Sequence, residues 1–132
     1  YEGMTWPSTE NAYQAMKTLD KEEWVKIANL PNAKLAKRAG RKLKDAGKQR
    51  ADWQSVNLRI MLELLRIKFA KPDLRQKLMD TGVAELSEGN AWGDDFWGKT
   101  RDSEGNWRGE NNLGKLLMQV RLEIQSNQTF SP

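Results

Sequence analysis

Apolar residues recur at helical spacing along most of this chain, and capping residues, glycines and prolines divide the pattern into short stretches. The clearest stretch covers 53–70 and is followed by Pro72, which cannot continue a helix. Shorter stretches follow the potential N-caps Ser8, Asp20 and Asn32. The pattern therefore predicts a mainly helical protein, a single multihelical domain with at most a small β-sheet.

The expected elements can be placed along the chain by their boundary residues. The pattern predicts helices over 9–19, between Asp20 and Pro31, between Asn32 and Gly47, over 53–70, around Leu74 and Leu78, and from 113 to about 124. In the first of these helices, Ala12, Met16 and Leu19 share one face. Residues 83–88 are expected to be extended. The glycine-rich stretch 89–111 is expected to be a long loop, a type of segment that is often functional.

Length and composition restrict both the class of protein and its chemistry. With 132 residues, at roughly 100–200 per domain, we expect one domain over 1–132. The sequence has no apolar run of about 18 residues and no secretory signal, so we expect a soluble, cytoplasmic protein without a membrane partner. It contains neither histidine nor cysteine. Mechanisms that need a Ser-His pair, a thiolate or a His-bound metal are excluded, and carboxylates are left as the candidate acid and base.

Charge is unevenly distributed along the chain, although the net charge is only +4. Residues 34–50 carry eight Lys or Arg side chains against Asp45 alone, whereas 85–104 is mainly acidic. The basic stretch has two interpretations, a solvated helix face or a surface that contacts phosphate or nucleic acid. Its basic positions run around most of the helix, which favours the solvated face.

The glycine-rich loop combines carboxylates with indoles. Asp94 lies between Trp92 and Trp97, and Glu88 borders the same loop. Aromatic rings with a nearby carboxylate form the kind of pocket that binds a nucleobase or a ribose. The alternative for Asp94 is an Asx-turn, in which the side chain only shapes the loop.

One formal motif in this loop is misleading. Gly93, Gly98, Lys99 and Thr100 satisfy the pattern of a nucleotide-binding P-loop. That site needs a strand before the loop and a helix beginning at the lysine, and neither pattern is present here. We therefore reject a nucleoside triphosphatase.

Six blocks of sequence resemble the NADAR, or YbiA-like, family in order and spacing. They are WPSTENAYQAMK (6–17), AKLAKRAGRK (33–42), Trp53 with Met61 and Lys68-Phe69, Leu86 with Glu88, Asp94 with Trp97-Gly98, and the stretch from Gly109 to Arg121. The resemblance covers nearly the whole chain. The family is mainly helical and includes N-glycosidases that act on ribosylamino intermediates of riboflavin synthesis and on ADP-ribosyl-guanine.

The resemblance implies a set of site residues. Carried over position by position, it assigns Glu10, Trp53, Asp94 and Trp97 to the active site, and Glu88, Gly98, Gly109 and Asn111 to substrate-binding positions. It implies Glu10 and Asp94 as the catalytic carboxylates, with Trp97 stacking on base or ribose and Asn111 binding hydroxyl or phosphate oxygens. Such chemistry needs no metal or other cofactor.

Three departures from the family pattern stand out. Asn11 occupies the position where many relatives have His, and residues 99–108 form an apparent insertion. Relatives also begin with an earlier segment that helps to form the site. By this resemblance, a sequence that starts at Tyr1 can lack that segment.

The function that these observations predict is hydrolysis of the bond between a ribose and a base. The expected partner is a ribosylated base or an ADP-ribose-type small molecule, either free or carried on ADP-ribosylated nucleic acid. Two alternatives stay open, a non-catalytic module that binds ADP-ribose or NAD and a basic helical domain that binds nucleic acid. Two carboxylates favour catalysis, because binding a phosphorylated ribose has little use for two anions.

Overall fold

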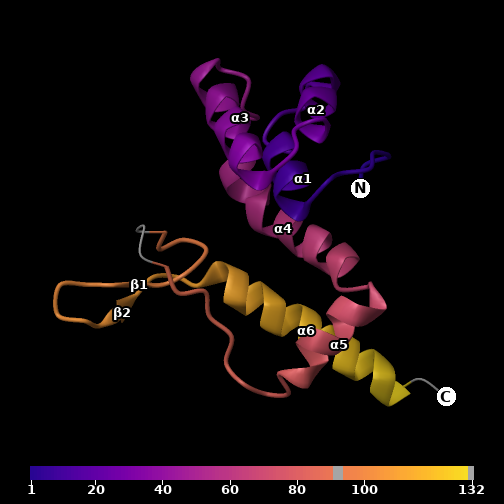
Figure 1. Cartoon of the computed structure of the whole chain (residues 1–132), viewed down its shortest axis with the longest axis vertical. Helices are drawn as coiled ribbons and strands as arrows, with labels where there is room; N and C mark the ends of the chain where they lie inside the picture. The colour runs from indigo at the N-terminus through magenta and orange to yellow at the C-terminus, as the bar shows by residue number, and fades with distance from the viewer. Residues whose placement is uncertain (91–93, 131–132) are drawn as a thin grey trace. The chain divides into compact units, whose positions relative to one another are not determined.

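The computed structural model describes residues 1–90 and 94–130, and the chain forms two compact units, Tyr1–Leu64 and Leu65–Pro132. Helices dominate both units (Figure 1). Across the described ranges, the β-structure is one two-stranded sheet and an isolated bridge between Gly89 and Lys99. The predicted fold class, mainly helical with a small sheet, is confirmed.

The first unit is built on helices that pack around a short first helix. It contains α1 (Thr9–Ala15), α2 (Lys21–Ala28), α3 (Ala33–Asp45) and most of α4 (Trp53–Lys68). α1 packs against both α2 and α3. The helix that carries Glu10 is therefore held from two sides.

The predicted caps of this unit are confirmed. The side chains of Ser8, Asp20 and Asn32 each accept a hydrogen bond from a backbone N–H two or three residues later, at 3.0–3.1 Å. These bonds satisfy N–H groups that a helix leaves without internal partners. Local sequence thus determines where the first three helices begin.

The predicted end of the first helix was wrong. α1 stops at Ala15, and Leu19, expected on the apolar stripe, is 66% exposed. The carbonyls beyond the helix bind other segments instead: Lys17 O accepts from Arg50 N at 2.6 Å, and Thr18 O accepts from the Trp24 indole at 2.8 Å. These tertiary hydrogen bonds replace the last predicted turn.

Asn11, at the position where relatives have His, ties α1 to the end of α2. Its side chain is fully buried, and its Nδ2 donates to Ile27 O at 2.9 Å and to Leu30 O at 3.1 Å. Ser8 Oγ donates to its Oδ1 at 2.6 Å. The buried amide therefore has partners at both ends, as a buried polar group requires.

The second unit is built on α5 (Pro72–Asp80) and α6 (Asn112–Phe130), which pack against each other. α6 extends beyond its predicted end near 124. The guanidinium of Arg121 joins α6 to the segment after α5, donating to Thr81 Oγ1 at 2.7 Å and to Ala84 O at 2.8 Å. Residues 83–88 were expected to be extended, but Val83 lies in a turn and 84–88 are irregular rather than a strand.

The apparent insertion contains a small hairpin inside the predicted loop. β1 (Thr100–Arg101) pairs antiparallel with β2 (Trp107–Arg108), with Arg101 opposite Trp107. The Arg101 guanidinium lies 4.4 Å from the centroid of the Trp107 ring, in cation–π geometry. The expectation of a loop throughout 89–111 was therefore partly wrong.

None of the helices in the described part of the chain is both long and apolar enough to cross a membrane.

Candidate active site

The predicted site residues divide between the two units. The first unit holds Glu10 and Trp53; the second holds Glu88, Asp94, Trp97, Gly98, Gly109 and Asn111. Trp92 and Gly93, which the sequence analysis placed in the same loop, lie outside the described residues.

Glu10 lies in the first turn of α1, where it is half-buried. One turn later along the helix, Gln14 Nε2 donates to Glu10 Oε1 at 2.7 Å. Lys17 lies just beyond the end of α1, where the charge of the Glu10 carboxylate acts on its ammonium group. The carboxylate is thus oriented by its own helix.

Lys17 lies near the rings of Tyr13 and Trp53. Its Nζ is 5.9 Å from the Tyr13 ring centroid and 6.0 Å from the Trp53 centroid, and the two ring centroids are 5.0 Å apart. Trp53 is only 5% exposed. Trp53 is therefore a core residue whose ring also helps to hold a cation near Glu10.

The environment of Lys17 disfavours its charge. Burial lowers the pKa of the Lys17 ammonium, and the positive charges of Arg41 and Lys44 on α3 act in the same direction, while the Glu10 carboxylate opposes them. Lys17 is the last residue of the matched block 6–17. Its spacing from Glu10 on the helix predicted over 9–19 could have identified it as a candidate site residue.

Gly40 on α3 makes room for this arrangement. A Cβ at position 40 would lie 1.8 Å from Gln14 Oε1 and 3.3 Å from Lys17 Nζ, which is too close for any side chain. Gln14 Oε1 is buried and accepts no hydrogen bond within the described part of the chain. Buried polar atoms without partners are uncommon in folded proteins.

In the second unit, Asp94 forms the turn that the alternative interpretation predicted. Its Oδ1 accepts from Phe96 N at 3.2 Å and from Trp97 N at 3.0 Å. The Asn90 side chain holds the Asp94 backbone by two further bonds, at 2.8 and 3.0 Å. Within the described residues, the other carboxylate oxygen makes no hydrogen bond or ion pair.

Asn111 uses its side chain to hold backbone. It is 3% exposed, its Oδ1 accepts from Glu88 N at 3.1 Å, and its Nδ2 donates to Leu86 O at 2.9 Å. Its own backbone has φ of 51°, in the left-handed region that asparagine tolerates better than most residues. The matched Asn111 thus positions the segment that carries Glu88.

The matched glycines allow close approach of backbone segments. A Cβ on Gly98 would lie 2.4 Å from Glu88 O, and one on Gly109, where φ is 130°, would lie 2.5 Å from Gly98 O. Lys99 N donates to Glu88 O at 2.6 Å, and Asn111 N donates to Gly98 O at 3.2 Å. These contacts bring the 86–89, 97–99 and 109–111 segments together.

Trp97 is fixed by both its backbone and its ring. Its carbonyl accepts from Leu113 N at 3.0 Å at the start of α6. The Phe96 and Trp97 rings meet edge to face, with centroids 4.8 Å apart. The half-buried indole is thus held in a defined place beside the Asp94 turn.

The two units supply different chemical groups. The first provides a half-buried carboxylate beside an amine with a lowered pKa, and the second provides a carboxylate and an indole on a tightly held loop. In the described ranges, no group of three or more Asp, Glu, His or Cys side chains is placed to hold a metal ion. Carboxylates of this kind can stabilise positive charge or transfer a proton.

Comparison with known proteins tests the predicted resemblance. The sequence profile of the NADAR domain matches residues 1–125. The N-glycosidase YbiA of Escherichia coli K12 is 36% identical over 125 residues, covering 93% of this chain and 73% of that protein. A riboflavin biosynthesis protein of Vibrio vulnificus is 35% identical over 130 residues, covering 98% of this chain but 34% of its own length.

A solved structure agrees with these sequence matches. The NMR structure of the E. coli protein YbiA has a TM-score of 0.82 and 34% identity, covering 99% of this chain and 74% of that one. The resemblance predicted from the six sequence blocks is therefore confirmed, and this chain belongs to the NADAR domain family.

Proposed function

We propose that this protein is an N-glycosidase, a hydrolase that cleaves the bond between a ribose, or a phosphorylated ribose, and a base. The observation that carries the proposal is the α1 cluster, in which the Glu10 carboxylate is held by Gln14 and accompanied by Lys17 over two aromatic rings. The names of relatives, N-glycosidase YbiA and riboflavin biosynthesis proteins, support the same class of reaction.

The chemistry follows from the charge that develops during bond cleavage. As the bond between C1′ and the base nitrogen breaks, the ribose takes on oxocarbenium character and the base accumulates electron density. A carboxylate close to C1′ stabilises the positive charge, and a second acid or base activates water or protonates the leaving base. We propose that Glu10 and Asp94 divide these roles, with no metal involved, so EDTA should leave activity unchanged.

The remaining matched residues have binding or positioning roles in this proposal. Trp97 stacks on base or ribose, and Trp53 supports the α1 cluster from the core. Asn111 was expected to bind substrate oxygens, but both ends of its amide hold backbone, so in this proposal Asn111, Gly98 and Gly109 keep the segment at Glu88 in place for the substrate. The hydrogen bonds of the Asn111 side chain and the close backbone approaches at Gly98 and Gly109 support these roles.

Two substrates test the proposal directly. ADP-ribosyl-guanosine and the ribosylamino intermediate of riboflavin synthesis are incubated separately with the protein, and products are identified by mass spectrometry. Release of free base from either substrate is the expected result. Saturable binding of ADP-ribose without release of base from either compound would instead indicate a non-catalytic binding module.

The basic face of α3 bears on whether the substrate is free or attached to nucleic acid. Its Lys and Arg side chains are exposed opposite Ala36, Gly40 and Leu43, which face the core. They spread over a wide arc, so we infer a solvated face and similar kcat/KM for a modified nucleoside and a modified oligonucleotide. Raising salt from roughly 50 to 200 mM would strongly lower kcat/KM for the oligonucleotide alone if this face bound phosphates. A preference for the oligonucleotide over the nucleoside at low salt would also contradict the solvated face. If an Arg38→Ala/Arg41→Ala/Lys42→Ala variant lost that preference, the phosphate contacts would lie on this face of α3.

A further inference from the structure

A cavity of about 390 Å³ lies in the second unit, and none of the predicted site residues lines it. Its walls come from the end of α4, from α5 and its preceding turn, and from α6; they comprise Arg66, Phe69, Ala70, Arg75, Val120, Glu123, Ile124 and Asn127. A volume of this order is within the range of small-molecule sites in proteins. The cavity is thus large enough for a compact ligand.

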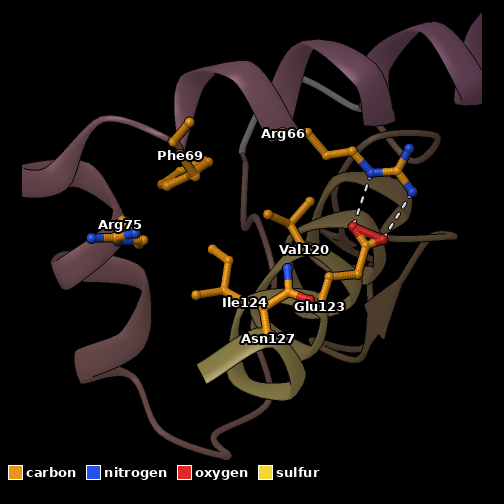
Figure 2. A pocket seen from close by; sticks show the side chains of 8 residues that line it. Arg66, Phe69, Arg75, Val120, Glu123, Ile124 and Asn127 are labelled. Atoms are coloured by element: carbon orange, nitrogen blue, oxygen red, sulfur yellow. Dashed lines mark hydrogen bonds and ion pairs between the residues drawn. The ribbon is translucent and has the colours of Figure 1, made fainter. Parts of the chain in front are cut away.

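The apolar part of the lining comes from Phe69 and Ala70 in the turn after α4 and from Val120 and Ile124 on α6. Figure 2 shows Phe69, Val120 and Ile124 gathered around the hollow, with Arg75 on one side and the Arg66–Glu123 pair on another. Val120 is only 2% exposed, while Phe69 and Ile124 are partly exposed. An aromatic ring beside two branched aliphatic side chains suits an apolar ligand body with a flat face.

The charged groups at the cavity differ in how far they are neutralised. Arg66 donates two hydrogen bonds to the Glu123 carboxylate, at 2.8 and 2.9 Å, and these bonds lower the pKa of Glu123, which keeps it ionised. The Arg75 guanidinium has no hydrogen bond or ion pair with any other described residue. Two cations and one anion leave one positive charge at the cavity, on Arg75.

We propose that this cavity is a binding site for a compact aromatic anion, an apolar ring system that carries one carboxylate, sulfonate or similar group. The ring lies against Phe69, Val120 and Ile124, and the anionic group binds the Arg75 guanidinium, whose planar set of donors suits oxyanions. Of the two arginines that line the cavity, Arg66 is neutralised by Glu123. The remaining charge on Arg75 therefore suits a ligand with one negative charge. The site does not depend on the proposed glycosidase activity.

Amide NMR of the full chain, titrated with naphthalene sulfonate, tests the site. The expected result is saturable shifts confined to signals of 66–75 and 120–127. Uncharged naphthalene sulfonamide, of similar shape, is expected to bind about tenfold more weakly, since a charge-assisted hydrogen bond is lost. Hexane sulfonate, with the same charge but no ring, is expected to bind more weakly than the aromatic anion.

Matched variants on α5 separate the specific site from general charge attraction. Arg75→Gln is expected to weaken sulfonate binding about tenfold and to leave sulfonamide binding unchanged. Lys77→Gln removes the same charge from the same helix, but Lys77 does not line the cavity, so it should change neither affinity. Equal effects of the two substitutions, equal affinity for the charged and uncharged compounds, or shifts elsewhere in the chain would overturn the proposal.

Discussion

The α1 cluster of the first unit and the 86–111 segment of the second use their family-matched residues in different ways. In the α1 cluster, side chains interact with one another: Gln14 holds Glu10, and Lys17 lies over aromatic rings. In the 86–111 segment, the matched side chains hold backbone: Asp94 binds two N–H groups, and Asn111 binds a carbonyl and an N–H.

This difference has a physical origin. A helix supplies its own backbone hydrogen bonds, so side chains on α1 are available for charge and packing. A segment without regular structure must satisfy its backbone groups in other ways, and short polar side chains do so at turns. Residues matched across a family can therefore be required for chemistry in one region and for local structure in another.

The largest effect is expected for the carboxylate of the α1 cluster. Glu10→Gln should lower kcat by about 100-fold or more, the usual scale for losing an acid, a base or a charge-stabilising group. Glu22→Gln is the matched control, because Glu22 lies in the first turn of α2 and is exposed. Near wild-type kcat in folded Glu10→Gln would leave Glu10 with only a helix-dipole role.

A pair of substitutions at Asp94 separates charge from turn formation. Asp94→Asn keeps an oxygen that can accept from Phe96 N and Trp97 N, whereas Asp94→Ala removes it. We expect both variants to lose about 100-fold in kcat, because both lose the charge. Only Asp94→Ala should also lose about 1–2 kcal/mol of unfolding free energy in denaturant titrations. Wild-type turnover in Asp94→Asn would show that Asp94 serves only the turn.

Two tryptophans of the second unit are expected to differ in their contribution to ligand binding. Trp97→Ala should weaken ADP-ribose binding by about 1–3 kcal/mol, the usual value of stacking a base on an aromatic ring. Trp107→Ala should have a smaller effect, because Trp107 lies in the apparent insertion with Arg101 over its ring. Titrations followed by tryptophan fluorescence measure both constants, and an unchanged value in Trp97→Ala would remove this indole from the binding site.

The smallest effect concerns the pH dependence of stability. The pKa of Lys17 is lower in the folded protein than its ordinary value of 10.5 in an unfolded chain. Between these two pKa values the unfolded state holds more protons, so the free energy of unfolding gains a contribution that rises with pH. The Lys17→Met variant lacks this contribution. The stability of the wild type relative to this variant should therefore increase as pH approaches 10.5.

Thermal or denaturant unfolding at several pH values measures this difference. Lys77→Met, which removes an exposed lysine on α5, serves as the control. A wild type that loses stability relative to Lys17→Met over the same interval would contradict the lowered pKa.

Helix starts and the family relationship could be predicted from the sequence, because both depend on local patterns. Ser8, Asp20 and Asn32 are caps with short-range partners, and the matched blocks keep their order along the chain. Helix ends were harder to predict. α1 ends early because Arg50 and Trp24 bind the carbonyls of Lys17 and Thr18, and these contacts join residues distant in sequence.

The hairpin and the α1 cluster depend on contacts that are not evident from local sequence patterns. Strands of two residues give no alternating pattern, so β1 and β2 were not predicted. The lowered pKa of Lys17 depends on burial and on Arg41 and Lys44 of a different helix, and so helical spacing alone could not establish it. The turn formed by Asp94, in contrast, was one of the two interpretations that its loop position allowed.

A double-mutant cycle on kcat with Glu10→Gln and Asp94→Asn tests whether the two carboxylates serve one reaction. If both carboxylates serve one reaction, the double variant should be only a few-fold slower than the slower single variant, because groups that act as a unit are strongly non-additive. Losses that multiply, giving about 10⁴-fold from two losses of about 100-fold, would contradict the joint role. Full activity in either single variant would contradict it as well.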